Sequence, residues 1–311
     1  PFKFARWNRG DRLELARFDG YWGEKPALAK ATFRFLSDPQ AQVAALRAGD
    51  VDAHTNLSAP EAVPQLKADA KLKVTIGGTE GETVLATNNA KPPFDNLKVR
   101  QAIAHALDRK TIALGVYGFD VNLIGSHFSP LHPAYVDLTG TYPYDPAKAK
   151  ALLKEAGFPN GFNCTLKLPP PSYARRSGEI VAALLAQVGI NAAIEPLEFP
   201  QWLERVFRNK DYDLSIIAHT EPLDIDIYAR DGYYFQYKDP DFKALIAKIA
   251  VTLPEGERNE LYKQAQRKLA QDAVNSFLFI LPKITVANAA LEGMWTDWPL
   301  PVTPLAELRW R

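Results

Sequence analysis

One short stretch of the chain concentrates side chains that could bind a ligand or transfer protons. An apolar run at residues 214–218 is followed, within eight residues, by His219, Glu221, Asp224 and Asp226. The run predicts a buried β-strand. Polar groups directly beyond such a strand are candidates for ligand contact, for a hard cation such as calcium, or for acid–base chemistry.

Two alternatives compete with ligand contact. Leu223, Ile225 and Ile227 alternate with Asp224 and Asp226, a pattern typical of a short edge strand with a solvated acidic face. Aspartate is a poor strand residue, which weakens this alternative without removing it. The spacing lacks the glycine turn and terminal glutamate of a helix–loop–helix calcium site. Ligand contact and a solvated loop both remain open for each carboxylate.

Other chemical motifs are weak. The chain has no nucleophile elbow, phosphate-binding loop, zinc-protease helix or dinucleotide fingerprint. His127 and His132, in "HFSPLHP", could bind zinc, but the spacing suggests no third ligand, so we predict neither a metal site nor a cofactor. Glycoside hydrolysis needs two facing carboxylates, and the closeness of Glu221 and Asp224 in sequence does not establish that geometry.

Composition narrows the class of protein. With 311 residues, 47% hydrophobic and 23% charged, the chain is long enough for two globular domains. A net charge of +1 gives no electrostatic case for nucleic acid or an anionic membrane as partner. The single cysteine, Cys164, excludes an internal disulfide and any multi-cysteine metal site. The apolar stretch 277–281 is too short to span a bilayer.

The sequence predicts where several helices begin and end. Asp38, Pro39 and Gly49 predict the N-cap, the first residue and the stop of one helix. Residues 97–117 have a helical apolar pattern that ends at Gly118, and a further Asp–Pro start and glycine stop delimit a helix in 145–157.

The elements that must position the polar cluster follow an alternating order. Strands are predicted at 162–168, 190–197 and 212–218, separated by helices, which indicates βαβ units and a parallel sheet. Ligands bind beyond the carboxyl ends of such strands. "PPPSY", containing Tyr173, follows the first strand at the same edge as His219. Tyr228 and its aromatic neighbours could stack on a ligand or belong to the core. The predicted ligand-binding residues are therefore His219, Glu221, Asp224, Tyr228 and Tyr173.

The ordered motifs point to a family. The chain contains, in this order, "FDNLKVRQAIAHALDRKTI", "YPYDPAKAKALLKEAGFPNGF", "IVAALLAQVGINAAIEPLEFPQWLERVFRNKDYDLSII" and "ERNELYKQAQRKLAQDAVNSFLFIL". Together with the upstream "PFKFARWNRGDRLELARFDGYWG" and "ALRAGDVDAH", they closely resemble the bacterial extracellular solute-binding proteins of the peptide/nickel class, family 5. These are the substrate-capturing subunits of ABC importers.

The resemblance covers essentially the whole chain and implies an α/β fold of the periplasmic-binding-protein type II, with two lobes and a hinge. Residues 1–84 and 281–311 would form the remainder of lobe I, and residues 85–280 a complete lobe II. The hinge would lie near 87–89 and 281–284. Because family members are usually longer before the segment that opens this chain, lobe I is expected to be incomplete, either in a fragment or in a short paralogue.

The function implied by the resemblance is transport. The protein would bind a small solute, peptide-like or other, between two lobes by hinge closure and pass it to a membrane permease. It would be a monomer in the periplasm or outside the cell, and it would not be an enzyme. His219 stands near the position of a family tryptophan, and "EPLDID" replaces the acidic motif that pairs with a peptide's amino group. Glu221 or Asp224 would then hold an ammonium group. A glycosidase-like hydrolase, or a signalling or chaperone protein on the same fold, is the alternative.

Overall fold

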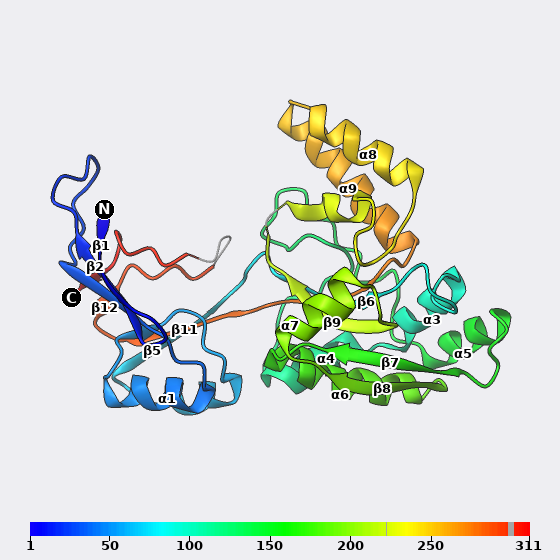
Figure 1. Ribbon diagram of the computed structural model, residues 1–311, viewed down its shortest axis with the longest axis horizontal. Helices are drawn as coiled ribbons and strands as arrows, with labels where there is room; N and C mark the ends of the chain where they lie inside the picture. Colours follow the sequence, from blue (N-terminus) through cyan, green and yellow to red (C-terminus); the bar gives the residue numbers. More distant parts are fainter. Residues whose placement is uncertain (222, 298–301) are drawn as a thin grey trace. The chain divides into compact units, whose positions relative to one another are not determined.

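The computed structural model describes residues 1–221, 223–297 and 302–311 (Figure 1). The chain divides into two compact units, residues 1–79 with 282–311 and residues 80–281. The first passage between the units lies at Thr79–Glu80, so the hinge predicted at 87–89 is wrong in position: those residues lie inside the second unit. None of the helices in the described ranges is long and apolar enough to cross a membrane.

The first unit is built from short antiparallel sheets and small helices. Its described strands form three groups: β1 (Phe2–Asn8), β2 (Arg12–Arg17) and β3 (Lys30–Arg34); β4 (Ala53–His54), β11 (Lys283–Asn288) and β5 (Leu72–Gly77); and β12 (Leu291–Glu292) with β13 (Arg309–Trp310). The helices are α1 (Pro39–Ala48), η1 (Pro60–Ala62) and α2 (Val63–Lys67). Strand β11 lies between β4 and β5, which joins the two ends of the chain in one sheet.

Helix α1 confirms the end signals read from the sequence. The Asp38 side chain accepts a hydrogen bond from the Ala41 backbone N–H at 2.7 Å, and Gly49 ends the helix with a φ of 76°. A left-handed φ is strained for a residue with a Cβ atom, which is why glycine is favoured at this position.

The second unit holds a five-stranded mixed sheet in the order β10-β6-β9-β7-β8. Strands β7 (Phe162–Leu168), β8 (Ile190–Pro196) and β9 (Leu214–His219) are parallel, which confirms the prediction from the βα alternation. Two further strands, β6 (Glu82–Thr87) and β10 (Ser276–Ile280), extend the sheet in the antiparallel sense. The carboxyl end of β9 therefore lies beside the amino end of β6.

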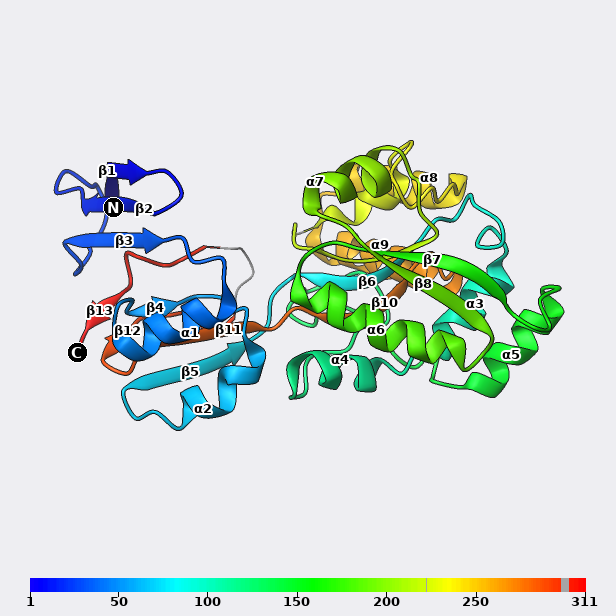
Figure 2. The same cartoon turned by 60° about the horizontal axis from the view of Figure 1, so that its bottom comes forward.

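Helices cover both faces of this sheet (Figure 2). One face packs against α6 (Ser172–Ala186), with α4 (Arg109–Tyr117) beside it and the pair α3 (Leu97–Ala106) and α5 (Pro146–Glu155) further along. The other face lies under α8 (Pro240–Val251), α9 (Glu255–Gln271) and the 3₁₀ helix η3 (Asp224–Ala229), with α7 (Phe199–Trp202) and the π-helix η2 (Leu203–Arg208) at its side. The site described below lies on this second face.

Three local predictions need correction. The helical pattern at 97–117 forms two helices, because Leu107 is extended and Asp108 caps the second helix through hydrogen bonds from Lys110 and Thr111. Tyr173 lies in the first turn of α6 and not in the proline loop. Residues 224–229 form η3, so the solvated edge strand is wrong.

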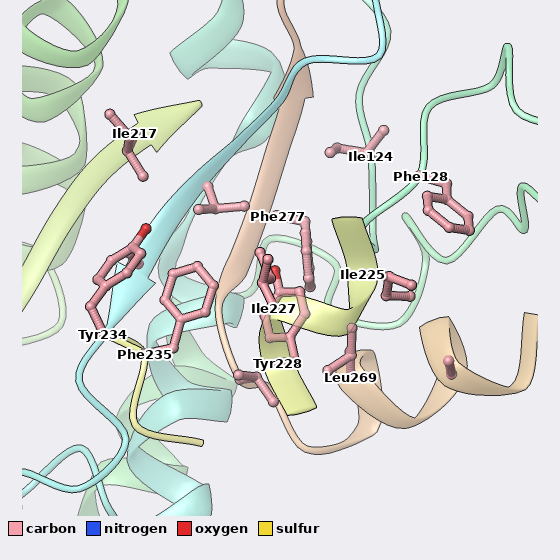
Figure 3. Close-up of a cluster of buried hydrophobic side chains, with 14 of the residues drawn as sticks. Ile124, Phe128, Ile217, Ile225, Ile227, Tyr228, Tyr234, Phe235, Leu269 and Phe277 are labelled. Carbon is pink, nitrogen blue, oxygen red and sulfur yellow. The ribbon is translucent and has the colours of Figure 1, made fainter. Parts of the chain in front are cut away.

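A hydrophobic cluster fills the space between the sheet and the second helical layer (Figure 3). Alternate residues of β6 and β9, among them Val84, Ala86 and Ile217, point into it. Phe277 of β10 and Leu269 of α9 pack against them, and both are almost completely buried. This cluster fixes the position of η3, whose Ile225 and Ile227 are part of it.

Asp213 ties β7 to β9 and gives a first prediction. Its Oδ2 accepts hydrogen bonds from the backbone N–H and the hydroxyl of Thr165, at 2.8 and 2.9 Å, and Lys91 Nζ lies 2.6 Å from its Oδ1. Burial opposes ionisation, but Lys91 and Thr165 outweigh it and lower the pKa of Asp213 below its usual range. Asp213→Asn should therefore reduce the free energy of unfolding by about 1.5–3 kcal/mol at neutral pH.

The sign of the pH dependence follows from the lowered pKa. The stability that Asp213 contributes is present above the pKa of an unfolded aspartate and is lost as the pH falls through the lower folded-state value. The difference between the wild type and Asp213→Asn in urea unfolding should therefore shrink as the pH falls below about 4. The exposed Asp120→Asn is the control, with an expected change below about 0.5 kcal/mol. A difference that stays constant with pH would contradict the argument.

Candidate functional site

The register of β6 and β9 places two residues of the site, Glu82 and His219, next to each other. In this antiparallel pair Glu82 lies directly opposite His219, and Val84 directly opposite Ile217. Opposed residues share a face of the sheet and bring their Cβ atoms to within about 5.5 Å of each other. Val84 and Ile217 point into the hydrophobic cluster, so Glu82 and His219 lie at the end of the same face. Both are buried, with 1% and 9% of their surface exposed.

Helix η3 places Asp224 over this pair. Its Ile225 and Ile227 are buried in the hydrophobic cluster (Figure 3), which anchors the helix from below. The Asp224 side chain is 11% exposed, whereas Asp226 is half exposed and pairs with Arg230 at 2.9 Å. The two aspartates, equivalent in the sequence, therefore differ: Asp224 belongs to the site and Asp226 to the surface.

His127 joins Glu82 to Asp224. Its Nδ1 lies 3.0 Å from Glu82 Oε1 and its Nε2 lies 2.9 Å from Asp224 Oδ1, and its side chain is 1% exposed. His132, the other histidine of "HFSPLHP", stacks on Phe128 with ring centres 4.0 Å apart and accepts a hydrogen bond from the Ala134 N–H. The partners of His127 are thus two carboxylates from other elements.

Burial and ion pairing set the protonation of this buried triad. Burial raises the pKa of Glu82 to about 8. Burial alone would lower the pKa of His127, but the two carboxylates outweigh it and raise that pKa to about 10. Burial also opposes ionisation of Asp224, yet contact with the His127 cation lowers its pKa. At neutral pH, His127 therefore carries a positive charge and Asp224 a negative one.

His219 and Glu221 form the outer part of the site. The Nε2 atom of His219 lies 3.0 Å from the hydroxyl of Tyr234, and its Nδ1 lies 3.8 Å from Asp224 Oδ2. Burial lowers the pKa of His219 to about 4, so its imidazole is neutral at neutral pH. Glu221 is exposed, and one of its carboxylate oxygens accepts a hydrogen bond from the Thr220 N–H at 3.1 Å.

The two predicted tyrosines lie at different depths. Tyr173 is half-buried, and its hydroxyl accepts a hydrogen bond from the Ala218 N–H at 3.0 Å, next to the end of β9. Tyr228 is 3% exposed and stacks on Phe235 with ring centres 5.0 Å apart (Figure 3). Tyr173 thus contacts the backbone of β9 one residue before His219, whereas Tyr228 lies behind the site. Whether either tyrosine contacts a ligand stays a prediction.

Sequence reasoning missed Glu82 and left His127 without partners. Glu82 opens the strand "ETVLAT", whose six residues are all buried, and a carboxylate in such a strand is a signal of a paired or functional group. This signal does not identify the partner of Glu82, because Glu82 lies far from His219 in the sequence. The partner becomes known only from the register of β6 and β9. Chemically, a neutral imidazole beside two carboxylates offers electron pairs to a positively charged group.

Comparison with known proteins gives the site a family context. Residues 1–239 match the model of the bacterial extracellular solute-binding proteins, family 5 middle region. The dipeptide-binding protein of Escherichia coli (strain K12) is 30% identical over 286 residues, which cover 86% of this chain and 52% of that protein. The glutathione-binding protein GsiB of Pectobacterium atrosepticum is 29% identical, with coverages of 95% and 60%. The chain thus spans about half of the length of these relatives.

Solved structures agree over the whole chain. The periplasmic binding protein DppA of Helicobacter pylori, in complex with the peptide STSA, superposes with a TM-score of 0.87 at 25% identity, over 100% of this chain and 62% of that one. The substrate-binding protein CtaP of Listeria monocytogenes superposes with a TM-score of 0.88 at 24% identity, over 100% and 66%. The fold is that of a type II periplasmic binding protein, and the chain belongs to the bacterial extracellular solute-binding proteins of family 5.

Proposed function

We propose that this chain is part of the substrate-capturing subunit of an ABC importer, which binds a small solute outside the cytoplasm and delivers it to a membrane permease. The family match over residues 1–239 carries this proposal. In it, the second unit, residues 80–281, corresponds to the predicted lobe II, and the first unit, residues 1–79 with 282–311, to the remainder of lobe I. The solute is held by hinge closure, which requires a preference of the solute for the closed form.

The proposed solute contacts are His219, Glu221 and Asp224, with Tyr173, whose hydroxyl accepts from the Ala218 N–H, as a further predicted contact. Asp224 is ionised and Glu221 is exposed, so the two carboxylates favour a positively charged group on the solute. The relatives include proteins named for binding dipeptides, heme and glutathione, which supports a small solute without identifying it.

A glycosidase-like hydrolase is the second candidate, because one observation favours it. The pKa of Glu82 is raised to about 8 and that of Asp224 is lowered, and carboxyl groups with separated pKa values suit a general acid and its partner. However, Glu82 is 1% exposed and lies behind His127, so a sugar oxygen cannot reach it in this arrangement. We therefore favour a solute receptor over a hydrolase.

Ligand-induced thermal stabilisation separates the two functions. The full-length protein should be melted with a panel of dipeptides, glutathione, hemin and divalent metal salts, and assayed in parallel on chromogenic glycosides. A receptor is stabilised by at least one member of the panel and shows no turnover. Turnover that is abolished by Asp224→Asn would establish the hydrolase and overturn the proposal.

Replacement of Glu221 tests the site with little effect on the fold. Its side chain is exposed, so Glu221→Ala should leave the melting temperature of the free protein within about 1 °C of the wild type. Loss of one charge-assisted contact should weaken binding of the stabilising panel member by about 10- to 150-fold, measured by isothermal titration calorimetry. Asp226→Ala, on the surface two residues beyond Asp224, is the matched control. Equal affinity in wild type and Glu221→Ala would remove Glu221 from the site.

A further inference from the structure

Two passages of the chain connect the two units, and the strand pairs on either side limit where these passages can bend. In the first unit, the pairing of β5 with β11 ends at Gly77 and Lys283, which lie directly opposite each other. In the second unit, the pairing of β6 with β10 begins at Glu82 and Ile280. Hinge motions are absorbed by a few residues at the ends of such elements. The residues between the two sets of pairs are 78–81 and 281–282.

A short segment near the end of the chain, residues 295–297, contacts the first-unit end of both passages. Asp297 Oδ1 accepts a hydrogen bond from the Gly78 N–H at 2.8 Å. The Trp295 carbonyl oxygen accepts a hydrogen bond from Lys283 Nζ. Lys283 is only 1% exposed, so its ammonium group depends on acceptors of the protein in place of water. The same three-residue segment therefore binds the chain beside each passage.

Gly77 shows how closely this segment packs on the end of β5. A Cβ atom at this position would lie 1.9 Å from the Thr296 carbonyl oxygen and 3.0 Å from Asp297 Oδ1. The first distance is far shorter than any normal contact, so a residue with a side chain would push the segment away. Gly77 does not have a left-handed φ. The close approach of the Thr296 backbone is therefore the reason for a glycine here.

The segment is itself fixed to the first unit. Met294, which precedes it, packs against the buried Leu291 and Leu308. The indole N–H of Trp295 donates a hydrogen bond to Glu307 Oε2 at 2.9 Å. The contacts to Gly78 and Lys283 are thus made from an anchored piece of backbone.

We propose that residues 295–297 form a clamp that holds the first-unit ends of both passages, and that Asp297 and Lys283 are positioning residues for hinge closure. With these ends held, bending is limited to residues 79–81 and 281–282. A restricted hinge leaves the open form fewer conformations, so less conformational freedom is lost when a solute is bound. The inference rests on the proposed function, because it assigns residues to the hinge that the receptor uses.

The width of the inter-unit distance distribution in the solute-free, full-length protein tests the clamp. Nitroxide labels on Ala44→Cys in α1 and Lys150→Cys in α5, both exposed positions, report it by pulsed electron–electron resonance in a Cys164→Ala background. Asp297→Ala should widen the distribution. Asp297→Asn should keep the wild-type width, because its amide oxygen can accept the same hydrogen bond. The exposed Asp50→Ala, in the same unit, is the control.

Solute affinity gives a second readout. In Asp297→Ala, the dipeptide, glutathione or hemin that stabilises the wild type should bind about two- to tenfold more weakly, the equivalent of one net hydrogen bond. Asp297 is exposed, so the fold of the first unit should persist, and hydrogen exchange of the β5 amides checks this. Asp297→Asn should restore the affinity, which a loss of negative charge alone would not do.

Gly77→Ala reaches the clamp from the other side and keeps the test open if Asp297→Ala does not fold. Its methyl group must displace Thr296, so it should widen the distance distribution as well. Gly140→Ala is the matched control, because a Cβ atom there meets nothing within 4 Å.

The remaining outcomes separate the clamp from the receptor. An unchanged width in both Asp297→Ala and Gly77→Ala, or equal widening in Asp297→Ala and Asp297→Asn, overturns the clamp. If the distribution widens as expected but no member of the panel binds, the clamp stands and the receptor fails. If a member binds with equal affinity in all variants and the width is unchanged, the clamp fails and the receptor stands.

Discussion

His127→Ala should lower the free energy of unfolding of the second unit by about 3–5 kcal/mol, the cost of breaking a buried ion pair from one side. The substitution removes the cation between Glu82 and Asp224, whose contacts to it are 3.0 and 2.9 Å. It leaves a carboxylate without its partner in a region where the His127 side chain is 1% exposed. It also removes a ring from the aromatic cluster, where His127 meets Tyr228 edge to face at 5.5 Å.

Unit-specific measurement is needed, because the two units need not unfold together. Hydrogen exchange of the β6 and β9 amides, followed by mass spectrometry under native conditions, reports the second unit alone. His132→Ala removes a histidine that is stacked on the same cluster but forms no ion pair with any described residue, and it should cost clearly less stability. Protection of β6 and β9 that is equal in the two variants would show that the His127–Asp224 ion pair contributes no stability beyond packing.

Phe277→Ala should destabilise the same unit by about 3–5 kcal/mol, through lost burial and the cavity left behind. Phe277 is 2% exposed, belongs to β10, and lies in the hydrophobic cluster under η3 with its ring centre 6.5 Å from that of Tyr228 (Figure 3). The cavity would lie directly below the helix that carries Asp224. We therefore expect weaker ligand binding along with lower stability.

Graded substitutions distinguish a cavity from a general disturbance of the sheet. Phe277→Leu keeps most of the volume and should cost less than half as much as Phe277→Ala in urea unfolding. Phe199→Ala removes a phenylalanine that is 44% exposed and should cost about 1 kcal/mol or less. Similar losses in Phe277→Leu and Phe277→Ala would contradict the cavity argument.

The revised view of Asp224 shows how packing changes a functional prediction. In the sequence, Asp224 and Glu221 are equivalent candidates for ligand contact. In the structure Asp224 is paired with a buried cation, whereas Glu221 is exposed. Replacing Asp224 should therefore reduce stability as well as affinity, and Glu221 gives the cleaner test of binding.

The sequence alone determined what depends on neighbours along the chain. The caps of α1, the stop at Gly118, and the βα order that makes β7, β8 and β9 parallel were predicted because capping and periodicity act over a few residues. The ordered motifs also sufficed for the family, and they located the polar residues at the end of β9.

Only the tertiary structure decided which polar groups meet. Glu82 reaches the site because β6 pairs with β9 in one register, and a shift of one residue would turn it to the other face. Asp224 points inward because Ile225 and Ile227 anchor η3 in the cluster, while Asp226 points to solvent. These choices follow from burial and strand pairing between distant segments, and a local pattern contains no information on them.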